Sequence, residues 1–563
     1  MGAMKPLFLL ILGLLLGAAP AAAARPWWQG AVIYEIYPRS FQDSNGDGIG
    51  DLNGITSRLD YLHKLGVDAI WLTPVYPSPQ VDFGYDIADY EAIDPVFGTM
   101  GDFDRLIAEA RKRNIRVIMD LVLNHSSDRH PWFERSRASR ADPKRDWYVW
   151  RDPRPGGGPP NNWLSLFGGS AWQWDPATGQ YYYHRFYVEQ PDLNWDNPAV
   201  RSAMYDVARF WMKRGVAGFR LDAIPSLFEG PGLGDEPYVL GPDGRKQRNA
   251  YGDFVVDSSK TDNLPKVHDV LRQLRRVSDS FPGTVLIGET YLPSIQDLAR
   301  MYGARGDELQ LPMDMQLGTI NRLDVPLFRT RIEEVETKVG GGQPLLAFTN
   351  HDNPRFDLRY GDGVHNEAIQ KLLATLLLAS RATALLYYGD EIGMTTTPPT
   401  RREDVRDPIG IKGWPKEKGR DGERTPMQWS GGAGAGFTRG RAWLPIPASH
   451  DRINVAAEAG DAQSMLAHYR RLIALRRHEP ALLNGGETML DDANPHVLSW
   501  LRSSGNRRVV VACNFTAEAR AASLSAAGRH ARTLLASFAN APVGTDLADV
   551  ALPPFGAWIG LVD

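Results

Sequence analysis

The segment GVAGFRLDAIP, residues 215–225, is an apolar run that ends at an acidic residue. Such a run, with glycine and proline at its borders, is typical of a buried strand. Arg220 and Asp222 lie two apart in it, and side chains two apart in a strand point to the same side. The segment therefore predicts a buried strand that presents a charged pair at its carboxyl end.

Seven further segments share this strand pattern and alternate with stretches of helical periodicity, such as residues 100–114 and 366–381. They are GAVIYEIYP (30–38), VDAIWLTPV (67–75), RVIMDLVLN (116–124), TVLIGETY (284–291), ELQLPMD (308–314), PLLAFTNHD (344–352) and TALLYYGDE (383–391). Alternating strands and crossover helices predict a parallel sheet, and eight strands suggest closure into a barrel. The expected fold is α/β, a (β/α)8 TIM barrel whose functional residues lie at the carboxyl ends of its strands.

Two regions do not follow this alternation. Residues 126–195 connect the third and fourth strands, and they are too long and too rich in Trp, Pro and Gly for a simple connection. We expect them to form an inserted subdomain. From residue 485 the pattern changes to short strands and turns, which predicts a C-terminal antiparallel β-sandwich over residues 485–563. The barrel then takes residues 25–125 and 196–484.

The N-terminus has the features of a secretory signal. Lys5 precedes the apolar run LFLLILGLLLGAA, residues 7–19, and a stretch of small residues ends at Ala24. The run is shorter than a bilayer span usually needs, so a cleaved signal peptide over residues 1–24 is favoured over a permanent anchor. We expect a secreted or periplasmic protein. Cys513 is the only cysteine, which excludes an intrachain disulfide.

Composition favours a small neutral substrate. The 563 residues include 63 basic and 67 acidic side chains, for a net charge of −4 with no long run of one sign. This balance argues against a nucleic acid or an anionic membrane as partner. The 16 Trp and 20 Tyr include clusters that could stack on sugar rings, although each of them could equally be part of the core.

Three acids, Asp222, Glu289 and Asp352, each end an apolar run. Cleavage of a glycosidic bond needs a nucleophile, a proton donor and a group that stabilises positive charge. Arg220 is expected to keep Asp222 ionised, whereas the apolar setting of Glu289 is expected to raise its pKa and suit it to a general acid. A lone acid is more often a solvated surface residue, but three at strand ends, with neutral donors such as His125 nearby, favour an active site.

A separate loop near the N-terminus carries oxygen side chains at alternate positions, with glycines between them. This is the first part of an EF-hand-like loop, and it predicts a cation site distant from the three acids. Gly54 stands where an EF-hand has its bidentate Glu, so a complete EF-hand is excluded. A turn without metal is the alternative. The candidate ligands are Asp43, Asn45, Asp47, Ile49 and Asp51.

From Trp27 to the C-terminus, the chain resembles the alpha-amylase superfamily, glycoside hydrolase family 13, in its alpha-glucosidase and oligo-1,6-glucosidase branch. The resemblance rests on a series of segments in order. They are VDFGYDIADY (81–90), DLVLNH (120–125), QPDLNWDNP (190–198), GFRLDAIP (218–225), GETY (288–291), FTNHDNPR (348–355) and GRDGERTPMQW (419–429).

The resemblance implies roles for individual residues. Asp222 would be the nucleophile, Glu289 the acid and base, and Asp352 the residue that orients the sugar and favours the strained transition state. A structural Ca²⁺ or Mg²⁺ would be held in the loop from Asp43 to Asp51, and no organic cofactor is implied. The positions that match substrate-binding residues are Asp82, Tyr85, His125, Gln190, Arg220, Ala223, His351, Arg420 and Arg424.

The implied activity is that of a retaining, exo-acting alpha-glucosidase, which releases glucose from short α-1,4-linked oligosaccharides such as maltose and can transfer it to another sugar. The α-1,4 preference rests on Ala223, because valine at this position goes with α-1,6 cleavage in the resembling enzymes. Pro225 departs from the Asn of the isomaltose-cleaving branch. Oligo-1,6-glucosidase, trehalose synthase and a sucrose-acting relative are the alternatives. A non-catalytic binding homologue is disfavoured because all three acids are present.

Overall fold

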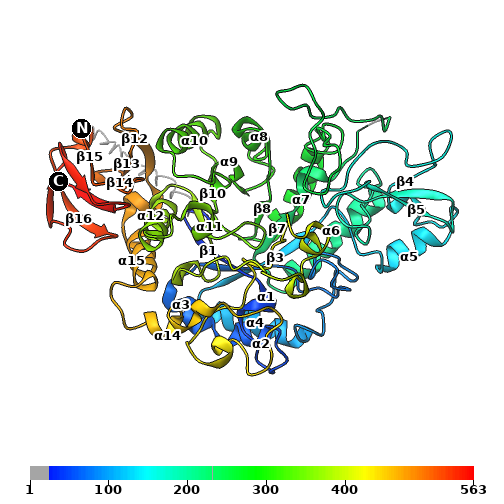
Figure 1. Cartoon of the computed structure of the whole chain (residues 1–563), viewed down its shortest axis with the longest axis horizontal. Coiled ribbons are helices and arrows are strands. Elements are labelled where there is room, and N and C mark those ends of the chain that lie inside the picture. Colours follow the sequence, from blue (N-terminus) through cyan, green and yellow to red (C-terminus); the bar gives the residue numbers. More distant parts are fainter. Residues whose placement is uncertain (1–24, 231) are drawn as a thin grey trace, which may run out of the picture.

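The centre of the molecule is a closed barrel of eight parallel strands (Figure 1). The computed structural model describes residues 25–230 and 232–563, so the expected signal peptide lies outside the described residues. A parallel bridge between Met313 and Leu345 joins the first and last strands of the order and closes the barrel. In spatial order the strands are β10 (Leu345–Leu346), β11 (Thr383–Tyr387), β1 (Val32–Ile36), β2 (Ala69–Leu72), β3 (Arg116–Val122), β7 (Gly218–Asp222), β8 (Val285–Gly288) and β9 (Leu311–Pro312). All eight predicted strands and the predicted fold class are confirmed.

Helices surround the barrel, and most of them bury one face, whereas α12 is buried on all sides over Ile369–Ala379. In α4, residues Met100–Lys112, Phe103, Leu106 and Ala110 are buried at helical spacing, and Thr99 with Asp102 forms a capping box at its start. The other covering helices are α3 (Leu59–Leu65), α6 (Pro198–Lys213), α7 (Val267–Asp279), α8 (Ile295–Arg300), α10 (Val325–Lys338), α12 (Asn366–Ala379) and α15 (Met465–His478). In the described part of the chain, no helix is long and apolar enough to cross a membrane.

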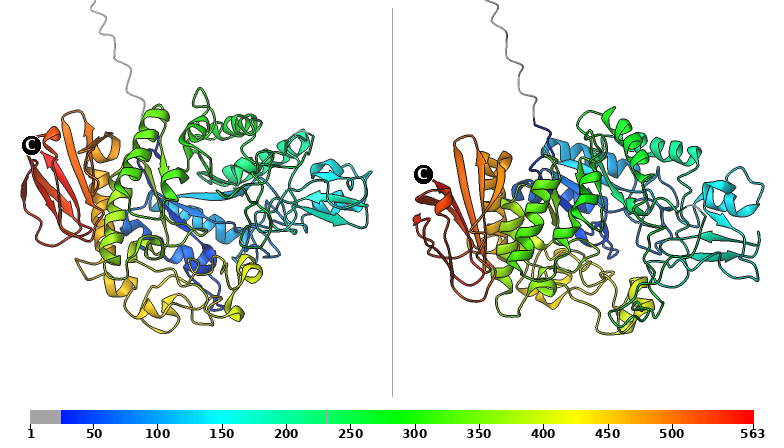
Figure 2. Two further views of the ribbon diagram at one scale, coloured as in Figure 1. Left: turned by 45° about the horizontal axis from the view of Figure 1, so that its top comes forward. Right: turned by 90° about the horizontal axis from the view of Figure 1, so that it is seen from above.

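The segment after β3 leaves the barrel as a small lobe at one end of the molecule (Figures 1 and 2). It contains α5 (Pro131–Ala138) and a three-stranded antiparallel sheet of β4 (Trp150–Arg151), β6 (Gln180–Tyr183) and β5 (Trp172–Asp175). Trp163, Trp172 and Tyr183 form its apolar core. The segment of residues 126–195 thus provides a wall with a core of its own beside the barrel.

A second excursion, which the sequence analysis did not predict, follows β7 and runs from residue 227 to residue 266. Isolated antiparallel bridges such as Tyr238 with Val256 shape it. It is attached to the lobe, because Asn161 Nδ2 donates to the Leu233 carbonyl at 3.0 Å and Trp163 Nε1 donates to the Gly234 carbonyl at 3.1 Å. Two separate connections of the barrel therefore build one side of the molecule together.

The C-terminal region is an antiparallel sandwich, as predicted. Its larger sheet has the order β12 (Gly486–Leu490), β13 (Val497–Ser504), β14 (Arg507–Asn514), β19 (Ala557–Val562), β16 (His530–Ala536) and β17 (Gly544–Asp546). β15 (Arg520–Ala522) and β18 (Val550–Leu552) form a small second sheet. One face of the large sheet packs on this second sheet, while the other face, with Trp500 and Cys513, joins the core of the barrel.

The contact between the sandwich and the barrel yields a stability prediction. Trp500 is fully buried, and its Nε1 donates to the Ala379 carbonyl at the end of α12 at 3.3 Å. We expect Trp500→Ala to lower the free energy of unfolding by about 3–5 kcal/mol, through lost burial and a residual cavity. Thermal and denaturant unfolding would measure this loss. Val543→Ala is the matched control because that side chain is 82% exposed. Equal unfolding midpoints for the two variants would contradict the prediction.

Candidate active site

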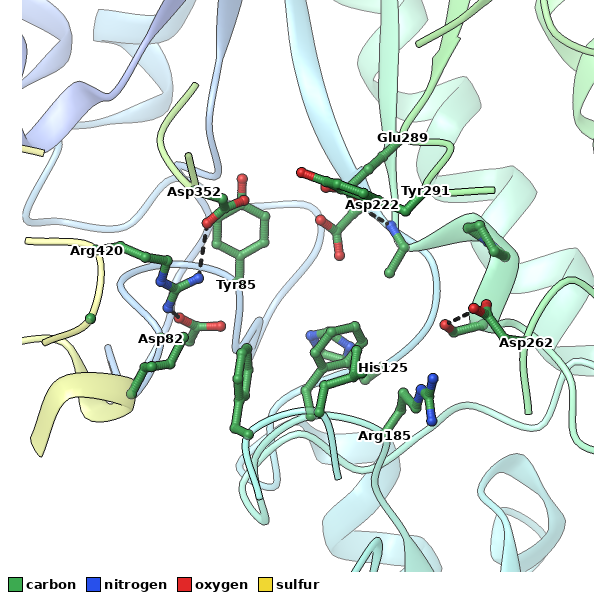
Figure 3. Close-up of a pocket in the computed structure, with 18 of the residues that line it drawn as sticks. Asp82, Tyr85, His125, Arg185, Asp222, Asp262, Glu289, Tyr291, Asp352 and Arg420 are labelled. Carbon is green, nitrogen blue, oxygen red and sulfur yellow. Dashed lines mark hydrogen bonds and ion pairs between the residues drawn. The ribbon is translucent and has the colours of Figure 1, made fainter. Parts of the chain in front are cut away.

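The carboxyl ends of the barrel strands surround a cavity of about 630 Å³ (Figure 3). Asp222 is the last residue of β7, Glu289 directly follows β8, and Asp352 lies in the loop after β10. All three acids line the cavity, so the structure brings the predicted catalytic residues together. Of the other predicted substrate-binding residues, Asp82, Tyr85, His125, Ala223 and Arg420 line it as well.

Arg220 lies behind the cavity wall and holds three carboxylates. Its Nη1 donates to Asp222 Oδ1 at 2.5 Å and to Asp120 Oδ1 at 3.0 Å, and its Nη2 lies 2.6 Å from Glu289 Oε1. These acids come from three neighbouring strands, β3, β7 and β8. Because Nη1 and Nη2 belong to one rigid guanidinium, Asp222 and Glu289 are held as a close pair.

The electrostatics of this pair differ from the expectation for Asp222. Burial raises the pKa of Asp222 to about 7, although Arg220 opposes the shift. Burial also raises the pKa of Glu289 to about 7, again against Arg220 and with a further increase from Asp222. The prediction that Arg220 keeps Asp222 ionised at neutral pH is not confirmed, because three acids share this one guanidinium. Both carboxyls therefore titrate near neutral pH.

Ala223 links the two acids through its backbone. Its N–H donates to Glu289 Oε2 at 2.9 Å, and its φ of 46° lies in the left-handed region. Non-glycine residues adopt this region at a cost of about 1–2 kcal/mol, and β-branched residues are strained most. Ala223 and Pro225 both line the cavity.

His351 and Asp352 form a second charged group. His351 Nδ1 lies 2.6 Å from Glu35 Oε1, and its Nε2 lies 3.0 Å from Asp352 Oδ2 and 2.7 Å from the Tyr85 hydroxyl. Although burial opposes it, Asp352 and Glu35 raise the pKa of His351 to about 9. A protonated His351 therefore donates from both ring nitrogens, and the Tyr85 hydroxyl donates to Asp120 at 3.0 Å.

Arg420 closes one end of the cavity. Its Nη1 donates to Asp352 Oδ1 at 2.9 Å, its Nη2 donates to Asp82 Oδ1 at 2.8 Å, and its Nε donates to Asp407 Oδ2 at 2.8 Å. Arg424 adds a 2.9 Å bond to Asp352 Oδ1 from the buried side. Against the effect of burial, His351, Arg420 and Arg424 hold the pKa of Asp352 well below its usual range.

Gln190 and His125 complete this end. Gln190 Nε2 donates to Asp82 Oδ2 at 3.2 Å and lies 3.1 Å from His125 Nε2. Burial lowers the pKa of His125 to about 3, so its ring is neutral. Gln190, Arg220, His351 and Arg424 thus lie behind the residues that line the cavity and fix their orientation.

Three buried acids of this site, Glu35, Asp120 and Asp407, were not predicted from the sequence. Each is fully buried and bonded to a cation of the site, namely His351, Arg220 and Arg420, respectively. The signal for Glu35 and Asp120 was present, because a charged residue inside an otherwise apolar strand is almost never buried unless it is paired. Asp407 lies in a long loop after β11, where no pattern marks it.

The loop from Asp43 to Asp51 is organised by backbone N–H groups. Asp43 accepts from Asn45, Gly46 and Gly48 at 3.0, 2.6 and 2.9 Å, and Asp47 Oδ1 accepts from Ile49 at 2.8 Å. Asp43 Oδ1 accepts two of these bonds, and its Oδ2 also accepts from the Thr438 hydroxyl. Oxygen atoms such as these are the donors that Ca²⁺ and Mg²⁺ prefer. However, across residues 25–230 and 232–563, no three His, Cys, Asp or Glu side chains are gathered as a metal site. The donor types fit a hard cation, whereas the acids are not gathered around one point.

Comparison with known proteins agrees with this geometry. The family described as alpha amylase, catalytic domain, matches residues 35–485, and the maltogenic amylase C-terminal domain matches residues 488–559. A probable alpha-glucosidase of Rhizobium meliloti (strain 1021) is 45% identical over 504 residues, which cover 88% of this chain and 90% of that protein. An oligo-1,6-glucosidase of Parageobacillus thermoglucosidasius is 40% identical and covers 87% and 91%, respectively.

Solved structures share the whole fold. The trehalulose synthase MutB from Pseudomonas mesoacidophila MX-45 superposes on this chain with a TM-score of 0.87 at 38% identity. The superposition covers 96% of this chain and 100% of the MutB chain. The alpha-glucosyl transfer enzyme XgtA has a TM-score of 0.87 at 40% identity, with the same coverage.

Proposed function

Because this chain belongs to the alpha-amylase family and is a glycoside hydrolase, we propose that it is an exo-acting alpha-glucosidase that prefers short α-1,4-linked oligosaccharides such as maltose. The family acts with retention of anomeric configuration, which requires two carboxyls about 5–5.5 Å apart. The observation that carries the proposal is the pair of Asp222 and Glu289 on one guanidinium, in a cavity that Arg420 closes at one end.

In the proposed mechanism, Asp222 attacks the anomeric carbon while Glu289 protonates the leaving oxygen. A glucosyl ester on Asp222 then forms, and water or a second sugar releases it with Glu289 acting as base. Asp352, kept ionised by His351 and two arginines, stabilises the positive charge that develops on the sugar ring. With both pKa values near 7, the state in which Asp222 is ionised and Glu289 is protonated is populated at neutral pH, and this state supplies the nucleophile and the acid.

The closed end supports exo action. Arg420 bonded to Asp82 and Asp352 fills the space beyond the bound sugar, so a longer chain could not continue past it. The same polar groups can bond the hydroxyls of a terminal, non-reducing glucose. Hydrolysis would therefore release one glucose unit at a time.

Relatives differ in the reaction that follows glucosyl transfer, since the solved neighbours include a trehalulose synthase and an alpha-glucosyl transfer enzyme. Sucrose-acting, trehalose-forming and α-1,6-cleaving activities are therefore the competing proposals. Incubation of the purified protein with maltose, isomaltose, sucrose and trehalose, followed by identification of the products, tests the proposal. Faster consumption of any of the other three sugars than of maltose would reject it.

Two further features complete the proposal. A Ca²⁺ or Mg²⁺ ion in the loop from Asp43 to Asp51 would stabilise the fold, with Asn45, Asp47 and the Ile49 carbonyl as additional ligands. The apolar run of residues 7–19 supports export to a secreted or periplasmic location.

The first prediction separates the two catalytic carboxyls. We expect Asp222→Asn to abolish turnover of every substrate. Glu289→Gln is expected to lower kcat/KM for maltose by about 10²–10⁴-fold but to affect an activated aryl glucoside far less, because a stable leaving group needs little protonation. Steady-state kinetics of both variants on both substrates would measure this.

The same pair predicts a bell-shaped dependence of kcat/KM on pH centred near neutral pH, since burial raises the pKa of both carboxyls to about 7. Activity falls at lower pH as the nucleophile gains a proton and at higher pH as the acid loses one. In Glu289→Gln, with the aryl glucoside as substrate, kcat/KM should still fall at low pH but should no longer fall at high pH. Retention of the alkaline limb in that variant would contradict the assignment of Glu289.

The second prediction concerns linkage. Ala223→Val adds two methyl groups beside the leaving sugar and is expected to shift the ratio of kcat/KM values toward isomaltose, by an amount equivalent to about 1–3 kcal/mol. The φ of 46° strains any β-branched side chain, so Ala223→Thr is a control of matched shape and strain. An unchanged ratio in both variants would show that Ala223 does not determine the linkage preference.

The third prediction concerns the metal. A cation that binds only the folded protein stabilises it by mass action, so chelation should lower the melting temperature and added Ca²⁺ or Mg²⁺ should restore it. Asp47→Ala should abolish this response, while turnover by protein that remains folded stays unchanged. A melting curve that responds to neither chelator nor added cation would exclude the site.

A further inference from the structure

The side of the cavity opposite Arg420 carries a second pair of charged residues, Arg185 and Asp262. Figure 3 shows them across the cavity from Asp82 and Arg420, with Asp222 between the two groups. A sugar bound at the closed end therefore points its scissile bond at Asp222 and its leaving group toward Arg185 and Asp262. Neither residue has a role in the chemistry described above.

Arg185 is an unusual wall residue because it is buried and incompletely bonded. Its side chain is 3% exposed, and Nη1 donates to Thr261 Oγ1 at 3.2 Å, whereas Nε has no hydrogen-bond partner. Within the described ranges it forms no ion pair at 4.0 Å or less. Burial of an unpaired guanidinium is costly. Nε is itself enclosed by protein, whereas Nη2 forms no hydrogen bond in the described part of the chain and is the donor that a ligand can reach.

The backbone of the lobe holds Arg185 in place. Its N–H donates to Asp192 Oδ1 at 2.7 Å, and its carbonyl accepts from Leu166 at 2.9 Å. The guanidinium is thus presented on a fixed frame and does not swing freely into solvent.

Asp262 is fixed by the excursion after β7. It accepts from Ser226 Oγ at 3.3 Å, and the neighbouring Asn263 N–H donates to the Pro225 carbonyl at 2.7 Å. Pro225 and Ser226 follow the nucleophile strand directly, so the position of Asp262 is tied to that of Asp222. A carboxylate has about four acceptor sites, and most of those of Asp262 remain for a ligand.

We propose that Arg185 and Asp262 form the polyol-binding wall of the leaving-group site. A vicinal diol can accept from Arg185 with one hydroxyl and donate to Asp262 with the other. The proposal rests on the proposed glucosidase function and adds to it the class of leaving group, a sugar or other polyol, and the class of acceptor in transfer. An anionic leaving group is disfavoured, because Asp222, Glu289 and Asp262 all face the same cavity.

The test compares leaving groups in one variant. Arg185→Met removes the donors, and charged hydrogen bonds of this kind correspond to roughly 10- to 100-fold in kcat/KM. We expect that loss for maltose, and less than about a threefold change for p-nitrophenyl alpha-glucoside, whose leaving group has no vicinal hydroxyls. Transfer to glycerol relative to methanol should fall as well. Arg129→Met is the control, because that arginine is on the surface of the same lobe.

Asp262→Asn provides a second, milder variant in case Arg185→Met does not fold, and melting curves would establish that both are folded. A selective loss on maltose in either variant supports the proposal. Equal losses on maltose and on the aryl glucoside would indicate a structural role and overturn it, as would unchanged kinetics on both. If the wild-type protein prefers another disaccharide, the linkage assignment fails, and the same comparison with that disaccharide still decides the role of Arg185.

Discussion

The site depends on one buried guanidinium. Arg220 binds Asp120, Asp222 and Glu289, which reach it from the adjacent strands β3, β7 and β8. Three carboxylates this close could not be buried without a cation, and one cation does not neutralise all three. The site therefore retains a proton near neutral pH. The shared arginine thus sets both the spacing of the acids and the charge state that acid–base chemistry needs.

Most of the barrel and of this group could be predicted from the sequence, because both follow short-range patterns. A run of apolar residues that ends in an acid marks a strand and its carboxyl end together, as at Asp222 and Glu289. Residues of long loops carry no such mark. Contacts with segments distant in the chain set the positions of the excursion of residues 227–266 and of Asp407, Arg185 and Asp262. The ionisation of Asp222 was misjudged for a related reason, because the sequence shows Arg220 beside Asp222 and does not show that Asp120 and Glu289 share it.

The two sides of the cavity have different origins. The barrel strands and the short loops that follow them supply most of the groups around the proposed glucose, to which the lobe adds Gln190, whereas the lobe and the second excursion supply Arg185 and Asp262 on the other side. Loops tolerate change better than strands, so the side that meets the leaving group can vary while the chemistry stays the same. This division is consistent with solved neighbours that differ in reaction but share the fold.

The bonds of Arg420 to Asp82 and Asp352 also impose an order of events. In the proposed reaction, Arg420 blocks the end of the cavity beyond the glucose, so substrate, water and both products would use the opening on the leaving-group side. The leaving sugar occupies that opening, so it must depart before water can reach the glucosyl ester, and glucose departs last. Free glucose can then bind the same empty form of the protein that substrate binds, so glucose would compete with substrate. Each turnover would end with an empty cavity and no retained chain.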